Sequence, residues 1–174
     1  MRLSHTINDR KLKERMRKDA EAFPRASVAA INRTARSAKT QANRTVRQTY
    51  NIKARDFNQV TRIRKATRNT LQAEIVTSER RISLRRYSAR QMRKGVRVTI
   101  VKGKPRVLSG TFIVKSLGGQ VFRRKTTARL PIEKMSGPSV MHMMASRNVF
   151  RKVSQFIDRK LPEEMDRAIK HFKR

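Results

Sequence analysis

Basic residues are the side chains of this sequence whose type and spacing could do chemistry. One dense group lies within residues 80–97 and a second within residues 123–129, and neither group contains an acid. Arginine presents a planar fork of N–H donors that fits a phosphate or a carboxylate. We therefore predict a surface that binds a polyanion or an acidic partner, formed by Arg80, Arg81, Arg85, Arg86, Arg90, Arg93, Lys94, Arg97, Arg123, Arg124, Lys125 and Arg129.

Patterns that would indicate catalysis or metal binding are weak. The three histidines, His5, His142 and His171, are far apart in the sequence, and there is no cysteine. The acids within residues 163–166 fit a helix start, where carboxylates oppose the positive end of the helix dipole. The sequence contains no Gly-x-Ser-x-Gly elbow, phosphate-binding loop or dinucleotide fingerprint. We therefore predict a protein that is not an enzyme, with no catalytic residue, cofactor, metal site or small-molecule substrate.

Positive charge dominates the composition of the 174 residues. Lys and Arg number 45 and Asp and Glu number 12, so the formal net charge is +33, while only 37% of the residues are hydrophobic. This little apolar surface argues against a self-sufficient monomer, because burial must offset the self-repulsion of the charges. Residues 80–132 hold 16 bases and no acid, so ion pairs within this stretch cannot neutralise it.

Membrane and secretion signals are not visible in the sequence. No apolar run approaches the length of a transmembrane helix, and the first twenty residues lack the apolar core of a secretory signal. We therefore expect a protein that is made in the cytoplasm and has no membrane partner.

Helices at the start of the chain are the first elements expected to position the basic residues. An amphipathic helix is predicted over residues 8–23 and is interrupted at Pro24, so we expect an N-terminal helix or arm over residues 1–23 and a single α+β domain over residues 24–174. A longer helix is predicted over about residues 24–50, because apolar residues recur every three or four positions. Four of these positions are predicted to form a close subunit interface: Ile31, Ala35, Ala38 and Ala42.

Short strands are predicted in the middle of the chain, after a shorter helix at about residues 54–61. Apolar and polar residues alternate at residues 71–75, 82–84, 96–100 and 112–114, and a further short apolar run is Val121-Phe122. This alternation predicts half-buried antiparallel strands that are apolar on one face and basic on the other. Turns are expected at residues 103–105 and 118–119, and residues 88–94 fit either a turn or a helical tip.

The helical period returns after Gly137-Pro138-Ser139. Apolar residues from Met141 to Ile157 predict a long C-terminal helix, with a bend near Pro162 and a new first turn at residues 163–166. The predicted fold class is therefore α+β, with N-terminal helices, a small antiparallel sheet carrying basic loops, and a long C-terminal helix bent near Pro162.

An ordered set of short strings carries a family resemblance. The strings are Ala29-Ala30-Ile31-Asn32-Arg33-Thr34-Ala35, Arg81-Ile82-Ser83-Leu84-Arg85-Arg86-Tyr87-Ser88-Ala89-Arg90-Gln91, Lys94-Gly95-Val96, Gly110-Thr111-Phe112-Ile113, Val121-Phe122-Arg123-Arg124, Leu130-Pro131-Ile132 and Gly137-Pro138-Ser139-Val140. Their order and spacing resemble the minor tail protein Z family of tailed bacteriophages over about residues 22–172.

The resemblance implies a virion structural protein that is made late in infection, in the host cytoplasm. Such a protein completes the head-proximal end of a long tail, where the tail joins the neck and head. The resemblance also implies a homo-oligomeric ring, with six-fold symmetry favoured, and contacts with the tail tube, the tail terminator or neck and connector proteins. The basic surface would meet one of these proteins or the end of the phage DNA, and the family offers no catalytic residues to transfer.

Two other functions fit parts of the sequence. A sequence-independent nucleic-acid binding protein, of the ribosomal or nucleoid type, would use the same bases on phosphates. Ribosomal proteins of this charge commonly carry long aperiodic tails, whereas this chain is periodic nearly throughout. A small DNA-processing enzyme would need an acidic metal cluster, and no acid lies between Glu79 and Glu133.

Overall fold

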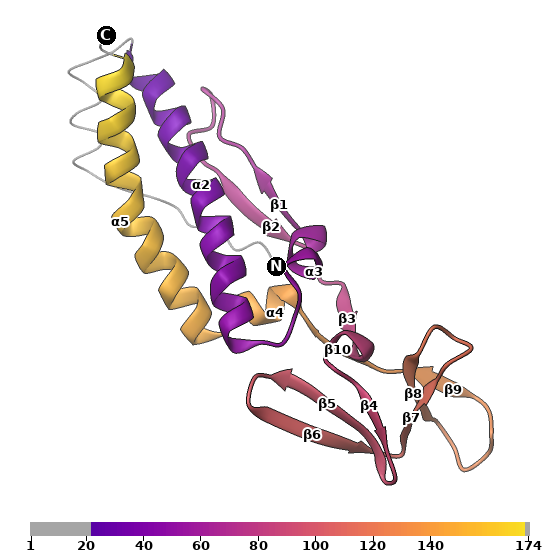
Figure 1. Ribbon diagram of the computed structural model, residues 1–174. Coiled ribbons are helices and arrows are strands. Elements are labelled where there is room, and N and C mark those ends of the chain that lie inside the picture. Colours follow the sequence, from indigo (N-terminus) through magenta and orange to yellow (C-terminus); the bar gives the residue numbers. More distant parts are fainter. Residues whose placement is uncertain (1–21, 173–174) are drawn as a thin grey trace. The chain divides into compact units, whose positions relative to one another are not determined.

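A computed structural model describes residues 22–172, with helices near both ends of this range and short strands between them (Figure 1). This arrangement confirms the predicted α+β class. The helix expected over residues 8–23 lies almost wholly outside the described residues. The helical elements are α2 (Ala22–Thr49), α3 (Ala54–Val60), the 3-10 turn η1 (Leu84–Arg86), α4 (Val140–Ala145) and α5 (Arg147–Phe172).

The strands of the described range form four small sheets, and every pairing in them is antiparallel. The first sheet is the hairpin of β1 (Thr61–Arg64) with β2 (Glu74–Thr77), and the second pairs β3 (Arg81–Ser83) with β10 (Ser136–Ser139). The third has the order β4 (Arg90–Met92), β5 (Gly95–Val101), β6 (Lys104–Ser109). The fourth has the order β7 (Thr111–Val114), β8 (Gln120–Arg124), β9 (Ile132–Lys134).

The described chain divides into two compact units. Unit 1 consists of residues 22–42, 61–77 and 147–172, which are most of α2, the β1–β2 hairpin and α5. Unit 2 consists of residues 43–60 and 78–146, which include α3, the other three sheets and α4. The expected division into an arm over residues 1–23 and a single domain over residues 24–174 stays a prediction.

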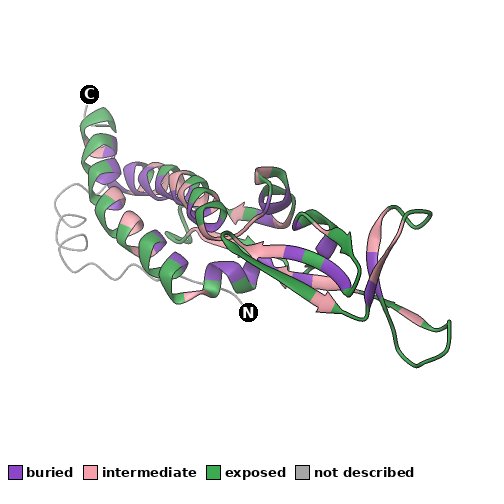
Figure 2. Ribbon diagram, turned by 60° about the horizontal axis from the view of Figure 1, so that its bottom comes forward, coloured by how far each residue is buried: buried purple, intermediate pink, exposed green. Residues whose placement is uncertain are grey.

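Helices α2 and α5 of unit 1 pack side by side through small side chains (Figure 1). Ala26 and Ala30 of α2 are fully buried in one cluster with Met165 and Ala168 of α5. Alanine adds little bulk, so the two backbones can approach closely, although each contact buries little area. Figure 2 shows the resulting division, with buried positions on one side of each long helix and exposed positions on the other. The predicted apolar stripe of α2 is confirmed by the burial of Ile31, Ala35, Ala38 and Ala42.

The β1–β2 hairpin is attached to α2 by the side chain of Asn32. Its Nδ2 donates to the carbonyl oxygen of Ala66 at 3.0 Å, and its Oδ1 accepts from the backbone N–H of Ala66 at 2.8 Å. Ala66 itself is buried in a cluster with Ile31 and Leu161. One residue of the string 29–35 thus satisfies both backbone groups at the root of the hairpin loop, which a buried backbone requires.

The long C-terminal helix is present, but its surroundings differ in two details from the predicted helix with a bend and a new first turn near Pro162. Two helices occur, because α4 ends at Ala145 and α5 begins at Arg147. Pro162 lies inside α5, which continues to Phe172, so the acids at 163–166 do not begin a new helix. Proline removes one backbone hydrogen bond, but Leu161, Met165 and Ala168 bury apolar surface around it. The tertiary packing therefore outweighs the local preference to break.

The core of unit 2 is built around Tyr87, which is fully buried. Its hydroxyl donates to the carbonyl oxygen of Pro138 at 3.0 Å. A Cβ atom at Gly137 would lie 2.6 Å from the Tyr87 ring, so the ring packs directly on the backbone of β10. The segment 137–139, expected as a break before a helix, instead forms part of this strand. Burial raises the pKa of Tyr87, and the negative charge of Asp56 raises it further.

Candidate binding surface

The twelve predicted binding residues are all exposed, and all belong to unit 2. They lie at three places along the chain. Arg80, Arg81, Arg85 and Arg86 lie on β3, η1 and the residue before them; Arg90, Arg93, Lys94 and Arg97 lie on the β4–β5 hairpin; and Arg123, Arg124, Lys125 and Arg129 lie at the end of β8 and in the loop that follows. The prediction that basic side chains face outward from short strands thus agrees with their positions.

Arg86 is engaged inside the unit. Its Nη1 donates to Oδ1 of Asp56 at 2.6 Å, and the Asp56 side chain is only 4% exposed. The second carboxylate oxygen, Oδ2, is buried and accepts no hydrogen bond from residues 22–172. Removing the guanidinium would leave a buried carboxylate without a counter-charge, which is costly. We therefore assign Arg86 to the core contacts of the unit. Asp56 lies thirty positions earlier in the chain, so residue spacing does not indicate this pair.

Three further bases of the set have contacts inside unit 2. Arg85 donates through Nη1 to the carbonyl oxygen of Gly118, in the β7–β8 turn. Arg123 and Glu133, on neighbouring strands, form an exposed ion pair at 3.7 Å. The guanidinium carbon of Arg124 lies 5.4 Å from the centroid of the Phe112 ring, which is a cation–π distance.

The remaining eight bases have no ion pair within the part of the chain that the structure describes. They are Arg80, Arg81, Arg90, Arg93, Lys94, Arg97, Lys125 and Arg129. The composition of unit 2 explains this result, because it holds 21 Lys and Arg residues against three acids. These eight exposed charges are available to a partner.

The β4–β5–β6 sheet arranges some of these charges in a row. Arg90 of β4 lies directly opposite Arg97 of β5, which lies opposite Val107 of β6. Residues opposite one another in an antiparallel sheet point to the same face. The neighbours of Arg97 on its own strand, Val96 and Val98, point to the other face and are buried. The buried side chains of β5 therefore hold Arg97 on the outer face, and the pairing of β4 with β5 places Arg90 beside it.

The side chain of Gln91 holds β4 in this register. Its Nε2 donates to the carbonyl oxygens of Met92 at 3.0 Å and Gly95 at 3.1 Å. Its Oε1 accepts from the backbone N–H of Ile113 at 2.9 Å, which links β4 to β7. A strand of three residues has few ladder bonds, so these three side-chain bonds add to the contacts that hold the backbone beside Arg90.

Sequence reasoning missed two exposed apolar side chains on the same face. Met92 is 45% exposed and Val107 is 49% exposed. Met92 lies opposite Gly95, and a Cβ atom there would lie 2.0 Å from the carbonyl oxygen of Leu108, so no side chain can fill that position. The pairing of Arg90 with Arg97 could have been predicted from a hairpin turn at Arg93-Lys94. The two arginines are equally distant from this turn, so the two strands that it joins place them opposite one another.

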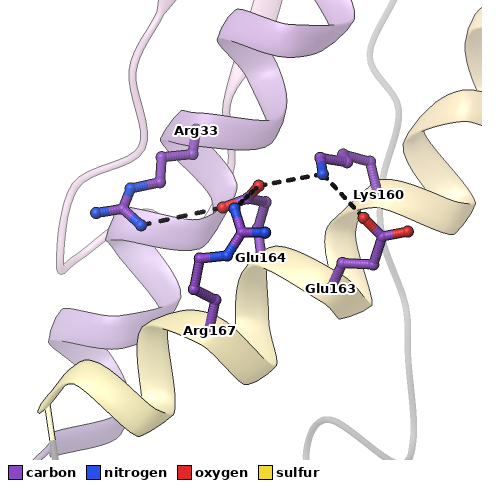
Figure 3. Close-up of polar contacts among 5 residues, drawn as sticks. All are labelled: Arg33, Lys160, Glu163, Glu164 and Arg167. Carbon is purple, nitrogen blue, oxygen red and sulfur yellow. Dashed lines mark hydrogen bonds and ion pairs between the residues drawn. The ribbon is translucent and has the colours of Figure 1, made fainter.

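Unit 1 holds its charges in a different way (Figure 3). Glu164 of α5, with a side chain 6% exposed, lies 2.9 Å from Arg167, 3.4 Å from Lys160 and 4.0 Å from Arg33 of α2. Lys160 also donates to Glu163 at 2.8 Å. This hydrogen bond is the main cause that lowers the pKa of Glu163 and raises the pKa of Lys160.

The four predicted subunit-interface residues lie inside the single chain. Ala38 and Ala42 are fully buried, and Ile31 and Ala35 are nearly so. Ile31 contacts Ala66 and Leu161 of the same chain. Their burial thus needs no second copy, and a subunit contact through them stays a prediction that requires α2 to leave these neighbours.

The described residues offer neither a metal cluster nor a membrane span. Within residues 22–172, no group of three or more His, Asp or Glu side chains is placed to hold a metal ion. Each helix within that range is too short or too polar to span a lipid bilayer.

Comparison with known proteins identifies the family. The family model described as prophage minor tail protein Z (GPZ) matches residues 9–174. Because this match covers nearly the whole sequence, the chain belongs to the prophage minor tail protein Z family, as the sequence resemblance predicted. It is therefore a phage tail protein, and the family is a structural one, which implies a location in the virion. Comparisons with curated proteins and with solved structures give no match.

Proposed function

We propose that this chain completes the head-proximal end of a phage tail, as a subunit of a homo-oligomeric ring at the junction of tail and head. The family match over residues 9–174 carries this proposal. The eight exposed bases without an ion pair support it, because a ring subunit of this charge needs an acidic neighbour to be stable. The neighbours would be the tail tube, the tail terminator or the neck and connector proteins, and six-fold symmetry is the one we favour for the ring.

Deleting the gene from a prophage tests the proposal directly. We expect tails of normal length that fail to yield infectious particles, with infectivity restored by the wild-type chain supplied from a plasmid. Electron microscopy of the particles would locate a gold-labelled chain at the head-proximal end. Normal infectivity without the gene, or label at the distal tip, would contradict the proposal.

The second candidate function is sequence-independent binding to the end of the phage DNA or to other nucleic acid. The observation that favours it is the excess of exposed arginines over acids in unit 2. Binding of the purified chain to random duplex DNA should then weaken steeply with salt, with a slope of about −0.9 for each phosphate contacted. Feeble binding to DNA at moderate salt would leave acidic proteins as the partner.

Charge-reversal variants for either test should avoid Arg85 and Arg86. Both side chains make contacts inside unit 2, with the carbonyl oxygen of Gly118 and with Asp56. A loss of function in such variants would report damage to the fold as well as loss of a partner contact.

A further inference from the structure

We propose that the outer face of the β4–β5–β6 sheet, formed by Arg90, Met92, Arg97 and Val107, is the docking surface for a protein partner that presents carboxylates beside apolar side chains. The inference rests on the proposed function, since it names the chemistry of the neighbour that the basic surface contacts. It commits to protein rather than to nucleic acid.

The first argument is the placement of two like charges. Arg90 and Arg97 are directly opposite one another on neighbouring strands, and like charges in this position destabilise a sheet. No ion pair among the described residues involves either side chain. The free protein therefore carries an unfavourable arrangement that a carboxylate placed between the two guanidinium groups would relieve.

The second argument is the apolar surface beside these charges. Val107 continues the row of Arg90 and Arg97 onto β6, and Met92 lies one pair further along β4 on the same face. About half of each apolar side chain is exposed. Phosphate backbones offer no apolar counterpart, and protein–DNA interfaces are the more polar kind. Protein interfaces are enriched in methionine and arginine together, which is the composition of this face.

The third argument is rigidity. The inner face of the sheet is held by buried Val96 and Val98, and the hydroxyl of Thr111 accepts from the Val96 N–H at 3.1 Å and donates to the Leu108 carbonyl oxygen at 2.6 Å. Gln91, which lies opposite Val96 and so on the same inner face, links β4 to β7 through its bond from the Ile113 N–H. A surface whose backbone is fixed in this way loses little conformational entropy when a partner binds.

The binding experiment uses three probes and three double variants of the full chain. The probes are poly-L-glutamate, a random copolymer of glutamate and tyrosine, and random-sequence duplex DNA. The variants are R90E/R97E, M92S/V107T and, as a matched control for charge, R147E/R151E on exposed positions of α5. Circular dichroism and thermal melting check that each variant is folded before its binding is measured.

We expect the wild-type chain to bind the copolymer more tightly than poly-L-glutamate. M92S/V107T should weaken copolymer binding about tenfold and leave DNA binding unchanged, because it removes apolar contact without changing charge. R90E/R97E should weaken binding to both carboxylate polymers about a hundredfold, and R147E/R151E less than threefold. Unchanged copolymer binding by M92S/V107T, or a loss confined to DNA in R90E/R97E, would overturn the inference.

Restoration of infectivity separates this inference from the proposed function. Purified chains are added to tails from a lysate that lacks the protein, followed by heads. Restoration by the wild type but not by M92S/V107T supports both proposals. Equal restoration by M92S/V107T would overturn the docking surface while the function in tail completion stands. Failure of the wild type would contradict tail completion, and the polymer binding would still decide the chemistry of the face.

Discussion

The two units of this protein differ in how they hold charge. In unit 1 the buried Glu164 lies near three cations, and Arg64 and Glu74 pair across the β1–β2 hairpin at 2.9 Å. In unit 2 the ratio of bases to acids is far higher, and Asp56 and Glu133 each pair with one arginine. The charge of Glu164 in unit 1 therefore links α5 to α2, whereas most bases of unit 2 have no ion pair among the described residues. The difference shows that net charge alone does not locate a binding surface, and that the pairing of each base must be known.

The largest expected effect comes from Arg86. This base of unit 2 pairs with a buried carboxylate, as the bases around Glu164 do in unit 1. Arg86→Met should lower the free energy of unfolding by about 3 kcal/mol, because it strands the buried carboxylate of Asp56. Urea unfolding measures the change. Arg81→Met is the control, since Arg81 is exposed and has no ion pair among the described residues, and it should stay within about 0.5 kcal/mol. Equal effects of the two substitutions would mean that the Asp56 pair does not stabilise the fold.

A smaller effect is expected at the charge cluster of unit 1. Glu164→Gln keeps the shape of the side chain but removes the charge that faces Arg33, Lys160 and Arg167. The free energy of unfolding should fall by about 2 kcal/mol, the usual value for hydrogen bonds to a charged group. Glu133→Gln serves as the exposed counterpart and should cost under about 0.5 kcal/mol. A cost at Glu133 as large as that at Glu164 would remove the distinction between the two units.

Relief of the like charges on the β4–β5–β6 sheet should stabilise the free protein. Arg97→Thr removes the charge opposite Arg90 and introduces a residue that favours strands, so the free energy of unfolding should rise by about 0.5 kcal/mol. Arg106→Thr is the matched control, because Arg106 lies opposite Val98 and has no like charge across from it. The gain should be larger for Arg97→Thr, and thermal melting compares the two. A loss of stability in Arg97→Thr alone would show that Arg97 has a structural role.

The smallest effect concerns pH and the exposed pair of Glu163 and Lys160. The pKa of Glu163 is lowered in the folded chain, mainly by the hydrogen bond from Lys160. The contribution of this pair is therefore complete above the ordinary glutamate pKa of about 4.3 and is lost as the pH falls through the lowered value. Glu163→Gln should make the free energy of unfolding less dependent on pH in the window between the lowered pKa and the ordinary value. Identical pH profiles for the two proteins would contradict this expectation.

Periodic parts of the fold could be predicted from the sequence, and parts that depend on distant contacts could not. The stripe of α2 follows from the spacing of Ile31, Ala35, Ala38 and Ala42, and the structure buries all four. The strand β10 was missed because its glycine and proline are typical of turns, and its partner β3 lies more than fifty positions earlier. Pro162 was expected to bend the C-terminal helix and to begin a new first turn, but α5 runs through it without interruption, with buried apolar residues on both sides.

On the candidate surface, too, local sequence predicts exposure but not the contacts between residues distant in the chain. Residue type alone predicted twelve exposed bases, and all twelve are exposed. It could not separate Arg86 from Arg90, because the separation depends on Asp56, which is brought near by the fold. The exposed Met92 and Val107 were also missed, because apolar residues in alternating strands are expected to point inward.

The two-point attachment of Ala66 by Asn32 has a practical consequence for locating the protein in particles. The hairpin loop beyond Ala66 is exposed at every position from Thr67 to Gln72, while its root is held by the Asn32 side chain. Exposed loop tips of polar residues with a fixed root tolerate insertions best. A short peptide tag or a single engineered cysteine placed between residues 68 and 70 would therefore give electron microscopists a label on unit 1 that leaves the β4–β5–β6 sheet untouched.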